Sequence, residues 1–399
     1  MRRLLPLSVL LAVVVATAGC GDDSAGGDGA GKDGSRPYRI GMIAPLTGNY
    51  EQLGRDHKKA VELAVEEINT AGGVLGRPIE LQVRDDRSEP NQSALAFNDI
   101  KGGVDVVIGS AFSNSALATI PLAEDARIPY VSLAPADEQV KPIRPHTFVV
   151  PATSAQYADR LLQYFQAMNL KKIAVAFDGR SSYATAGLIG MRDKAGYYGL
   201  TLVASEEFQT GISDFTAIFN RVKNSGAQVL TVWATGPPAV TATKQYATSK
   251  LALPLVMTGA QASRLFLDPA GSAAEGLTIA SSIGVVGSYL PEGEQKEVIA
   301  SLSRSFRALY KYAPPQFAQD GYSAVQLIAA AAKQAKSIDR AKVRDALENI
   351  RLVTPNGYYA YSKTDHNGLT SDFISVNKVD GGALIPTDWA KSQFPAAMR

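Results

Sequence analysis

The chain has 399 residues, with 40 Lys and Arg against 38 Asp and Glu and a single cysteine. This nearly neutral balance gives no overall positive field for nucleic acid, so we expect no nucleic-acid partner. One cysteine cannot build a disulfide framework or a thiolate metal site, and we expect no metal site and no cofactor. The length exceeds one typical core and suits two domains.

The N-terminus has the pattern of an export signal. Met1-Arg2-Arg3 precedes an uncharged stretch, Leu4 to Gly19, that is too short to span a bilayer comfortably, so residues 1–19 are predicted to be a signal peptide. Small residues directly before Cys20 resemble a bacterial lipobox, which predicts that Cys20 is lipidated and attaches the chain to the membrane. Residues 20–36 comprise this cysteine and a Gly-, Asp- and Ser-rich flexible tether.

Strand and helix patterns alternate after the tether. Strands are predicted over 39–44, 79–84, 104–108, 128–133, 172–177, 200–207, 228–233 and 254–257. Helices are predicted between them, including 91–101, 155–168, 215–223 and one that begins near Ala116. This alternation indicates parallel, doubly wound sheets.

The last third is predicted to hold helices over 295–312, 321–334 and 340–349, followed from Thr354 by short strands and turns. A late helix pair after two α/β halves could pack back on the first half. We therefore expect the chain to cross between two domains several times, with a cleft between them that can hinge.

Two polar loops are expected to face one crevice. Residues 110–115 follow one predicted strand and residues 134–136 follow the next, and parallel strands end at the same edge of a sheet. Serines in the first loop are expected to cap the helix that follows, and a helix start is a natural anion site. An ordinary crossover with capping serines explains this stretch equally well.

The motifs together resemble the type I periplasmic binding proteins, specifically the branched-chain amino-acid (Leu/Ile/Val-type) substrate-binding family of ABC importers. The resemblance rests on Pro45-Leu46-Thr47-Gly48, Ile68-Asn69-Thr70-Ala71-Gly72-Gly73, Asp85-Asp86, Val107-Ile108-Gly109-Ser110, Ile128-Pro129-Tyr130-Val131-Ser132, Asp214-Phe215, Ala274-Glu275-Gly276-Leu277 and Gly321-Tyr322-Ser323-Ala324. It implies an α/β fold of two doubly wound parallel-sheet lobes joined by a three-segment hinge. Lobe 1 is predicted at 37–149 plus 281–354, and lobe 2 at 150–280 plus 355–399.

The resemblance also implies a ligand site between the lobes. Ser113 matches the serine that holds the ligand carboxylate, and the backbone of Ala134 matches a further contact. Tyr183 matches the aromatic residue that lobe 2 lays on the ligand, and Phe317 borders the pocket. Further candidates for ligand contact are Tyr50, Phe112, Asn114, Ala136, Gly236 and Gln261.

Three positions depart from the family pattern, and the first two concern the ligand ammonium. Ala136 replaces the usual threonine, the expected acid of lobe 2 falls near the uncharged Ala260 and Gln261, and the tyrosine expected near Gly236 is missing. A buried ammonium without a carboxylate partner is costly. We therefore expect an aromatic or aliphatic carboxylate or an amide as the ligand, for which the neutral Gln261 amide is suited.

An enzyme is poorly supported by the sequence. The three histidines, His57, His146 and His366, are predicted to lie away from the crevice loops, and no triad, nucleophile elbow or metal spacing is present. We predict a lipid-anchored solute-binding protein on the outer face of a bacterial cytoplasmic membrane that delivers a small ligand to an ABC permease. A binder of branched-chain or other amino acids and a lipid-anchored sensor for a signalling partner are the alternatives.

Overall fold

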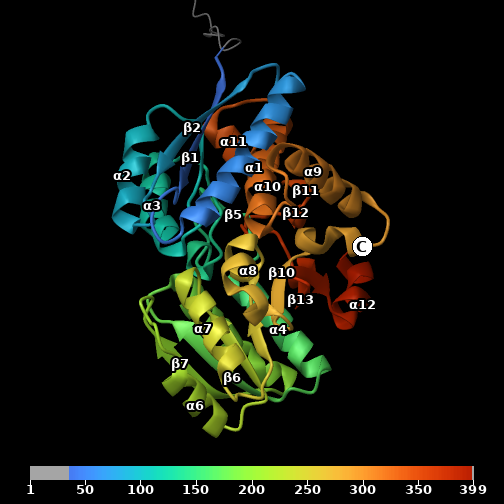
Figure 1. Ribbon diagram of the computed structural model, residues 1–399. Coiled ribbons are helices and arrows are strands. Elements are labelled where there is room, and N and C mark those ends of the chain that lie inside the picture. Colours follow the sequence, from blue (N-terminus) through green and yellow to red (C-terminus); the bar gives the residue numbers. More distant parts are fainter. Residues whose placement is uncertain (1–35, 398–399) are drawn as a thin grey trace, which may run out of the picture. The chain divides into compact units, whose positions relative to one another are not determined.

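The alternating strands and helices form two main sheets, each at the centre of one lobe (Figure 1). The structure is a computed structural model that describes residues 36–397, so the predicted signal peptide, Cys20 and all of the tether except Arg36 lie outside the described residues. Lobe 1 has a parallel sheet in the order β2-β1-β3-β4-β5. Its strands are β1 (Tyr38–Ala44), β2 (Ile79–Asp85), β3 (Val106–Ile108), β4 (Tyr130–Ser132) and β5 (Thr147–Val149).

Lobe 2 has a seven-stranded sheet in the order β14-β13-β10-β9-β8-β6-β7. Its strands are β6 (Lys172–Asp178), β7 (Thr201–Phe208), β8 (Val229–Trp233), β9 (Leu255–Met257), β10 (Thr278–Ser282), β13 (Ile374–Asp380) and β14 (Ala383–Pro386). The strands from β7 to β10 are parallel, whereas β13 and β14 add to one edge as antiparallel strands. The predicted parallel sheet therefore carries an antiparallel edge, a common arrangement in doubly wound folds.

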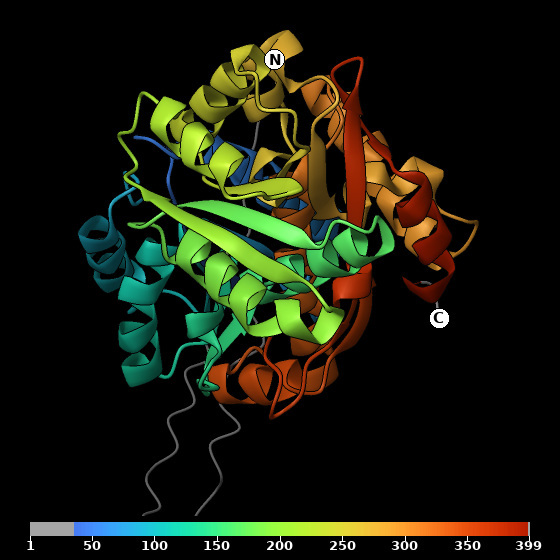
Figure 2. The ribbon, with the colours of Figure 1, turned by 90° about the horizontal axis from the view of Figure 1, so that it is seen from below.

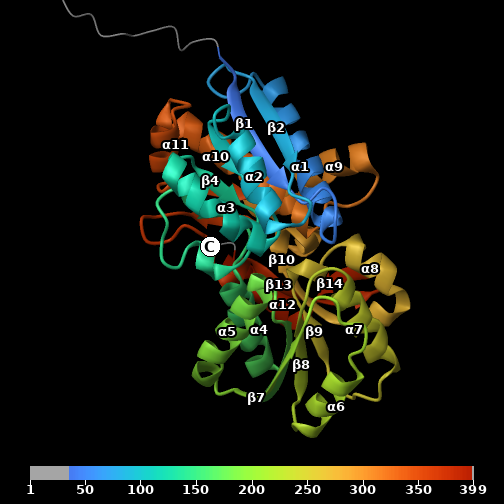
Figure 3. The same cartoon turned by 90° about the vertical axis from the view of Figure 1, so that its left-hand side faces the viewer.

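Helices cover both faces of the lobe 1 sheet, because successive strand residues point to opposite sides. Ile40 and Met42 of β1 pack with α1 (Glu51–Thr70) and α10 (Gln316–Ala335). Ile43 on the opposite face packs with α2 (Pro90–Ile100) and α3 (Ser113–Ala126). Figure 3 shows α2 and α3 side by side over the sheet. The lobe is thus doubly wound, as predicted.

Lobe 2 repeats this arrangement. Ile173 and Val175 of β6 pack with α4 (Ser154–Ala167) and α5 (Ser182–Ala195), whereas Ala174 and Ala176 pack with α6 (Thr216–Asn224) and α7 (Pro237–Thr248). In Figure 2 the lobe 2 strands run between these helix layers. The remaining helices and strands are α8 (Arg264–Ala270), α9 (Glu294–Tyr310), α11 (Arg340–Leu347), α12 (Asp388–Ala397), β11 (Arg351–Thr354) and β12 (Gly357–Ala360).

The described chain passes between the lobes three times, after β5, after β10 and after β12. The antiparallel pair of β11 and β12 spans the predicted boundary between residues 354 and 355. The first and third crossovers are bonded to each other. Tyr361 Oη donates to Val149 O over 3.0 Å, and Asn367 Nδ2 donates to Pro151 O over 2.8 Å.

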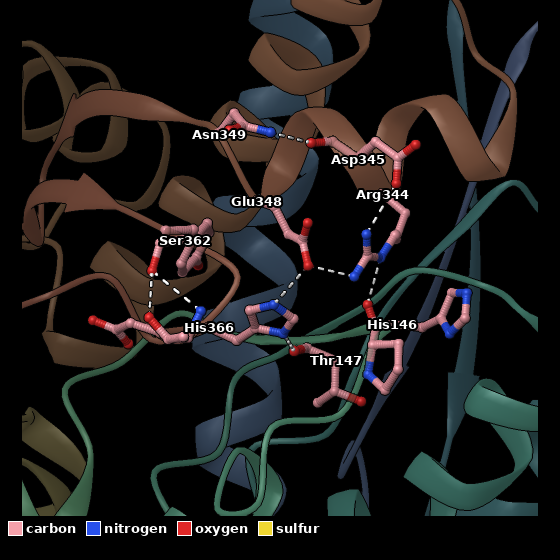
Figure 4. A network of polar contacts seen from close by, with 12 residues as sticks. His146, Thr147, Arg344, Asp345, Glu348, Asn349, Ser362 and His366 are labelled. Atoms are coloured by element: carbon pink, nitrogen blue, oxygen red, sulfur yellow. Dashed lines mark hydrogen bonds and ion pairs between the residues drawn. The ribbon is translucent and has the colours of Figure 1, made fainter.

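A buried polar network lies beside these two crossovers (Figure 4). His366 is fully buried, with Nδ1 2.8 Å from the carbonyl oxygen of Thr147 and Nε2 3.4 Å from Glu348 Oε1. Its ring stacks on Phe148 with a centroid separation of 4.3 Å. Arg344 donates to Glu348 and also to Pro145 O. The network ties α11 to the last strand of the lobe 1 sheet and to the third crossover.

Two helix boundaries differ from the prediction in ways that affect the site. Helix α3 begins at Ser113 rather than near Ala116, and α10 begins at Gln316 rather than at Gly321. Pro314-Pro315 directly precedes α10, where proline is suited to a helix start. Within residues 36–397, none of the helices combines the length and apolar character needed to span a bilayer.

Candidate ligand-binding site

The loops after β3 and β4 leave the same edge of the lobe 1 sheet. Gly109, directly after β3, lies against the ring of Tyr130 on β4. A Cβ at position 109 would be 2.1 Å from the Tyr130 hydroxyl oxygen, so a larger residue would force the two strands apart. The close packing of Gly109 on Tyr130 therefore constrains the loop that connects β3 to α3.

A cavity lies where these loops meet lobe 2. Lobe 1 contributes the segments around Tyr50, Ser113, Leu133 and Phe317, and lobe 2 contributes those around Tyr183 and Thr258. The cavity's mainly apolar lining with a few polar groups is typical of small-molecule sites. The two predicted loops therefore do reach one cavity.

The hydroxyl of Ser113 is free at the start of α3, contrary to the expectation that serines cap this helix. The N-cap residue is Phe112, and no side-chain cap hydrogen bond is formed. Ser113 Oγ lines the cavity, is buried and has no hydrogen-bond partner among residues 36–397. The first N–H groups of a helix lack intrahelical partners and attract negative charge. A carboxylate or carbonyl oxygen bound here would satisfy both kinds of donor.

Aromatic side chains form much of the cavity wall. Tyr50 and Phe112 stack with centroids 4.4 Å apart, and burial, with smaller effects from nearby acidic residues, raises the pKa of Tyr50 to about 12. Tyr183 packs on Trp233 and shares a hydrogen bond with the Thr258 hydroxyl. Since burial also raises the pKa of Tyr183, both phenols keep their protons at neutral pH. These residues offer neutral aromatic surfaces with hydroxyl groups.

Five of the predicted contact residues line the cavity: Tyr50, Phe112, Ser113, Tyr183 and Phe317. Asn114 lies beside it and hydrogen-bonds to lobe 2 instead. Ala134 and Ala136 do not line it. The carbonyl oxygens of both alanines accept from the Gln139 side-chain amide, at 2.7 and 2.9 Å, and the neighbours Leu133 and Pro135 face the cavity.

Gly236 and Gln261 lie at a neighbouring hollow between the lobes. The Gln261 amide is used within lobe 2, where Nε2 donates to Ala234 O over 2.8 Å and Oε1 accepts from the Thr258 backbone at 3.4 Å. Its side chain is buried. The structure therefore does not bring the donor and acceptor of Gln261 to the cavity.

Six polar residues of the cavity wall were not among the predicted contacts: Tyr157, Ser181, Thr235, Thr258, Gln316 and Asp320. Gln316 and Asp320 are four residues apart and therefore share one face of α10. Placing the helix start at Gly321 left both residues in a loop. The prolines before Gln316 were the signal that would have placed them in the first turns of the helix.

His57 corrects another expectation. It was predicted to lie away from the crevice loops, but its ring lies 5.4 Å from that of Phe317 and its Nε2 is 3.9 Å from Asp320 Oδ2. His57 thus lies directly behind the cavity wall. Within the described part of the chain, no group of three or more His, Cys, Asp or Glu side chains is arranged to hold a metal ion.

Two α/β lobes with three crossovers and a cavity between them define a two-lobed binding protein. Residues 37–383 match the family model described as periplasmic binding protein, and the chain belongs to this family. A Leu/Ile/Val-binding protein homologue of Brucella melitensis is 27% identical, over 87% of this chain and 92% of the relative. The predicted family resemblance is confirmed.

Solved structures share the fold. The branched-chain amino acid transporter substrate-binding protein of Streptococcus pneumoniae in complex with isoleucine has a TM-score of 0.77 at 24% identity, over 88% of this chain and 98% of that one. A solute-binding protein of Rhodopseudomonas palustris in complex with benzoate has a TM-score of 0.75 at 21% identity, over 88% and 95%. The chain is a solute-binding protein rather than an enzyme, of a periplasmic or extracytoplasmic family that binds small molecules.

Proposed function

We propose that the protein is the lipid-anchored substrate-binding component of an ABC importer and that it binds a small carboxylate or amide ligand between its lobes. Family membership supports the transport role. The small residues before Cys20 support attachment to the outer face of the cytoplasmic membrane. The absence of a carboxylate from the expected position near Ala260 supports a ligand other than a standard α-amino acid.

The free hydroxyl of Ser113 is the observation that carries the proposed ligand class. A buried hydroxyl without a partner is unfavourable, and the start of α3 adds backbone N–H groups that favour an oxygen acceptor. The aromatic walls suit an apolar remainder of the ligand. A carboxylate or amide oxygen at Ser113 with a hydrocarbon body beside Tyr50 and Phe317 fits both features.

Closure of the lobes is the proposed mechanism. The ligand first binds lobe 1 at Ser113, and lobe 2 then covers it with Tyr157 and Tyr183. The ligand increases the population of the closed form only as far as it binds that form more tightly than the open one. The closed form presents the ligand to the permease.

Calorimetry with amino acids and their deamino analogues tests the ligand class. The fold itself does not decide between amino acids and other carboxylates, since related structures hold isoleucine in one case and benzoate in another. We expect 4-methylpentanoate or its amide to bind at least as tightly as leucine. Tight binding of leucine or valine alone would favour the amino-acid alternative.

The lipid anchor and the partner require separate experiments. Mass spectrometry of the membrane-bound protein is expected to detect a lipid-modified Cys20 as the first residue, and Cys20→Ala is expected to release the protein from membranes. Ligand-dependent stimulation of a reconstituted permease ATPase would support the importer. Ligand binding that instead regulates a signalling protein would favour the sensor alternative.

A further inference from the structure

The hollow at Gly236 and Gln261 adjoins the ligand cavity directly. Leu53, near the start of α1, and Ala260 of lobe 2 line both spaces. Because these two residues come from opposite lobes, the boundary that they form between the cavity and the hollow widens or narrows as the lobes move. A ligand that extends past Leu53 and Ala260 therefore enters the hollow without leaving the cleft between the lobes.

Apolar side chains form much of the wall of this hollow. Lobe 2 contributes Val240 of α7 and Leu265 and Phe266 of α8, a helix at the end of lobe 2 nearest to lobe 1 (Figure 1). Phe266 is buried, whereas Val240 and Leu265 are only half-buried. Apolar surface that still contacts water in the free protein favours burial by an apolar part of a ligand.

The start of α7 offers few hydrogen-bond donors to a polar group. Gly236 is the N-cap residue, and Pro237 and Pro238, the first two residues of the helix, have no backbone N–H. Two of the N–H groups that would attract an anion at a helix start are therefore missing. This contrasts with the start of α3, where Ser113 presents a free hydroxyl to the cavity.

The charge in the wall of the hollow is balanced. Glu51 is the only ionisable side chain among its described lining residues, and the Glu51 carboxylate pairs with Arg55 over 2.6 Å. Asn49 and Gln52 also line the hollow but are exposed, so their amides can stay hydrated beside a bound hydrocarbon chain. The hollow is thus better suited to an uncharged chain than to a second charged group of the ligand.

We propose that the hollow is a second subsite, which binds the distal part of an unbranched acyl chain whose carboxylate or amide lies at Ser113. This inference rests on the proposed function and names its substrate class, medium-chain monocarboxylates and their amides. The chain runs from Ser113 past Leu53 to Val240. Since both lobes line the hollow, a longer chain also gives lobe 2 more apolar surface on which to close.

Straight-chain ligands of two lengths test this subsite in the unaltered protein. We expect octanoate to bind at least tenfold more tightly than pentanoate in calorimetry, and octanamide to show the same gain over pentanamide, because each buried methylene strengthens binding about fourfold. Binding of pentanoate as tightly as octanoate would overturn the subsite and leave the proposed function intact. If none of the four ligands binds, the proposed function fails as well.

Val240→Trp gives the second measurement, since an indole at this half-buried position would occupy the hollow. We expect it to weaken octanoate binding at least tenfold and to change pentanoate binding less than twofold. Leu95→Trp is the matched control, because Leu95 is 61% exposed on α2 and does not line the hollow. Equal losses for the two acids, or no loss for octanoate, would contradict the proposal.

Leu265→Ala tests the same wall without adding volume. We expect this variant to reduce the preference for octanoate over pentanoate at least threefold, because part of the apolar wall is removed. Leu309→Ala is its control, since Leu309 is 52% exposed on α9 and outside the hollow. An unchanged preference in Leu265→Ala would overturn the proposal even if Val240→Trp does not fold.

Discussion

Asn114 and Ser182 join the two lobes by a hydrogen bond between the starts of two helices. The backbone N–H of Ser182, at the start of α5, donates to Asn114 Oδ1 over 3.1 Å. Asn114 Nδ2 in turn donates to Arg180 O over 3.0 Å. One side chain of α3 is thereby bonded in both directions to lobe 2, next to Ser113, which lines the cavity. The contact can form only when the lobes approach each other.

Asn114→Ala is expected to weaken ligand binding about fivefold without a large change in the stability of the free protein. A hydrogen bond of this type contributes about 1 kcal/mol, which here favours the closed form only. Calorimetry measures the affinity and thermal denaturation measures stability. Asn98→Ala is the control, since Asn98 is exposed on α2 and bonds only to Lys101 among the described residues. Unchanged affinity in Asn114→Ala would show that the contact does not stabilise closure.

Ser113→Ala is expected to weaken the binding of a carboxylate ligand at least tenfold, or about 1.4 kcal/mol. The loss follows from removal of the free hydroxyl that faces the cavity. Ser115→Ala provides a close control, because Ser115 is a buried serine two residues further along α3 that does not line the cavity. Titration calorimetry should show a lower affinity for the carboxylate ligand in Ser113→Ala than in Ser115→Ala. Equal affinities in the two variants would show that Ser113 does not bind the ligand.

Asp86 is expected to make stability fall as the pH rises from about 4 to about 7. Burial raises the pKa of Asp86 from 3.8 to about 6, partly offset by its hydrogen bonds. In this pH range the folded protein therefore keeps a proton on Asp86 that the unfolded chain has lost. The contribution of Asp86 to the free energy of unfolding is fully present below about pH 4 and is lost as the pH rises past 6. The change is about 3 kcal/mol at most.

Asp86→Asn removes this titration. In urea unfolding, we expect the free energy of unfolding of the variant, relative to that of the original protein, to increase by about 2–3 kcal/mol between pH 4 and pH 7. Any effect of the new amide on the free energy of unfolding that does not depend on pH cancels in this comparison. The same difference at both pH values would mean that the folded-state pKa of Asp86 is not raised.

His366→Ala is expected to lower the free energy of unfolding by about 3 kcal/mol. The substitution removes a fully buried ring, its stacking on Phe148 and the donor to Thr147 O, and it leaves the largely buried Glu348 with one partner fewer. His146→Ala is the comparison variant in the same region (Figure 4), because its side chain is 19% exposed and pairs with Glu124. We expect a loss below about 1 kcal/mol there. Equal losses in urea unfolding would contradict the assigned role of His366.

The sequence was sufficient for the fold and for one side of the cavity. Ser113, Tyr50 and Phe112 follow predicted strands, and the geometry of parallel sheets brings such loops together without further information. Ala134 and Gln261 could not be assigned in this way, because the hydrogen bonds of Gln139 and of Thr258 decide which groups remain available for a ligand. These contacts depend on side-chain orientation, which periodicity does not specify.

Asp320 shows a different limit. The family pattern directed attention to an acid in lobe 2, whereas this carboxylate comes from a helix of lobe 1 more than 200 residues after Ser113 in the sequence. Neither spacing nor composition relates two residues so far apart. Their common cavity follows from the return of the chain to lobe 1 after β10, and only the packing of α10 on α1 shows it.

The bonds of Tyr361 and Asn367 to residues 149 and 151 have a mechanical consequence. Two of the three connections between the lobes are held to each other by these hydrogen bonds, which resist sliding of one connection along the other. The remaining freedom is a bend across the bonded pair, so the opening motion should be a rotation about a nearly fixed axis. Such a pivot would return Asn114 to the same partners in every closing cycle.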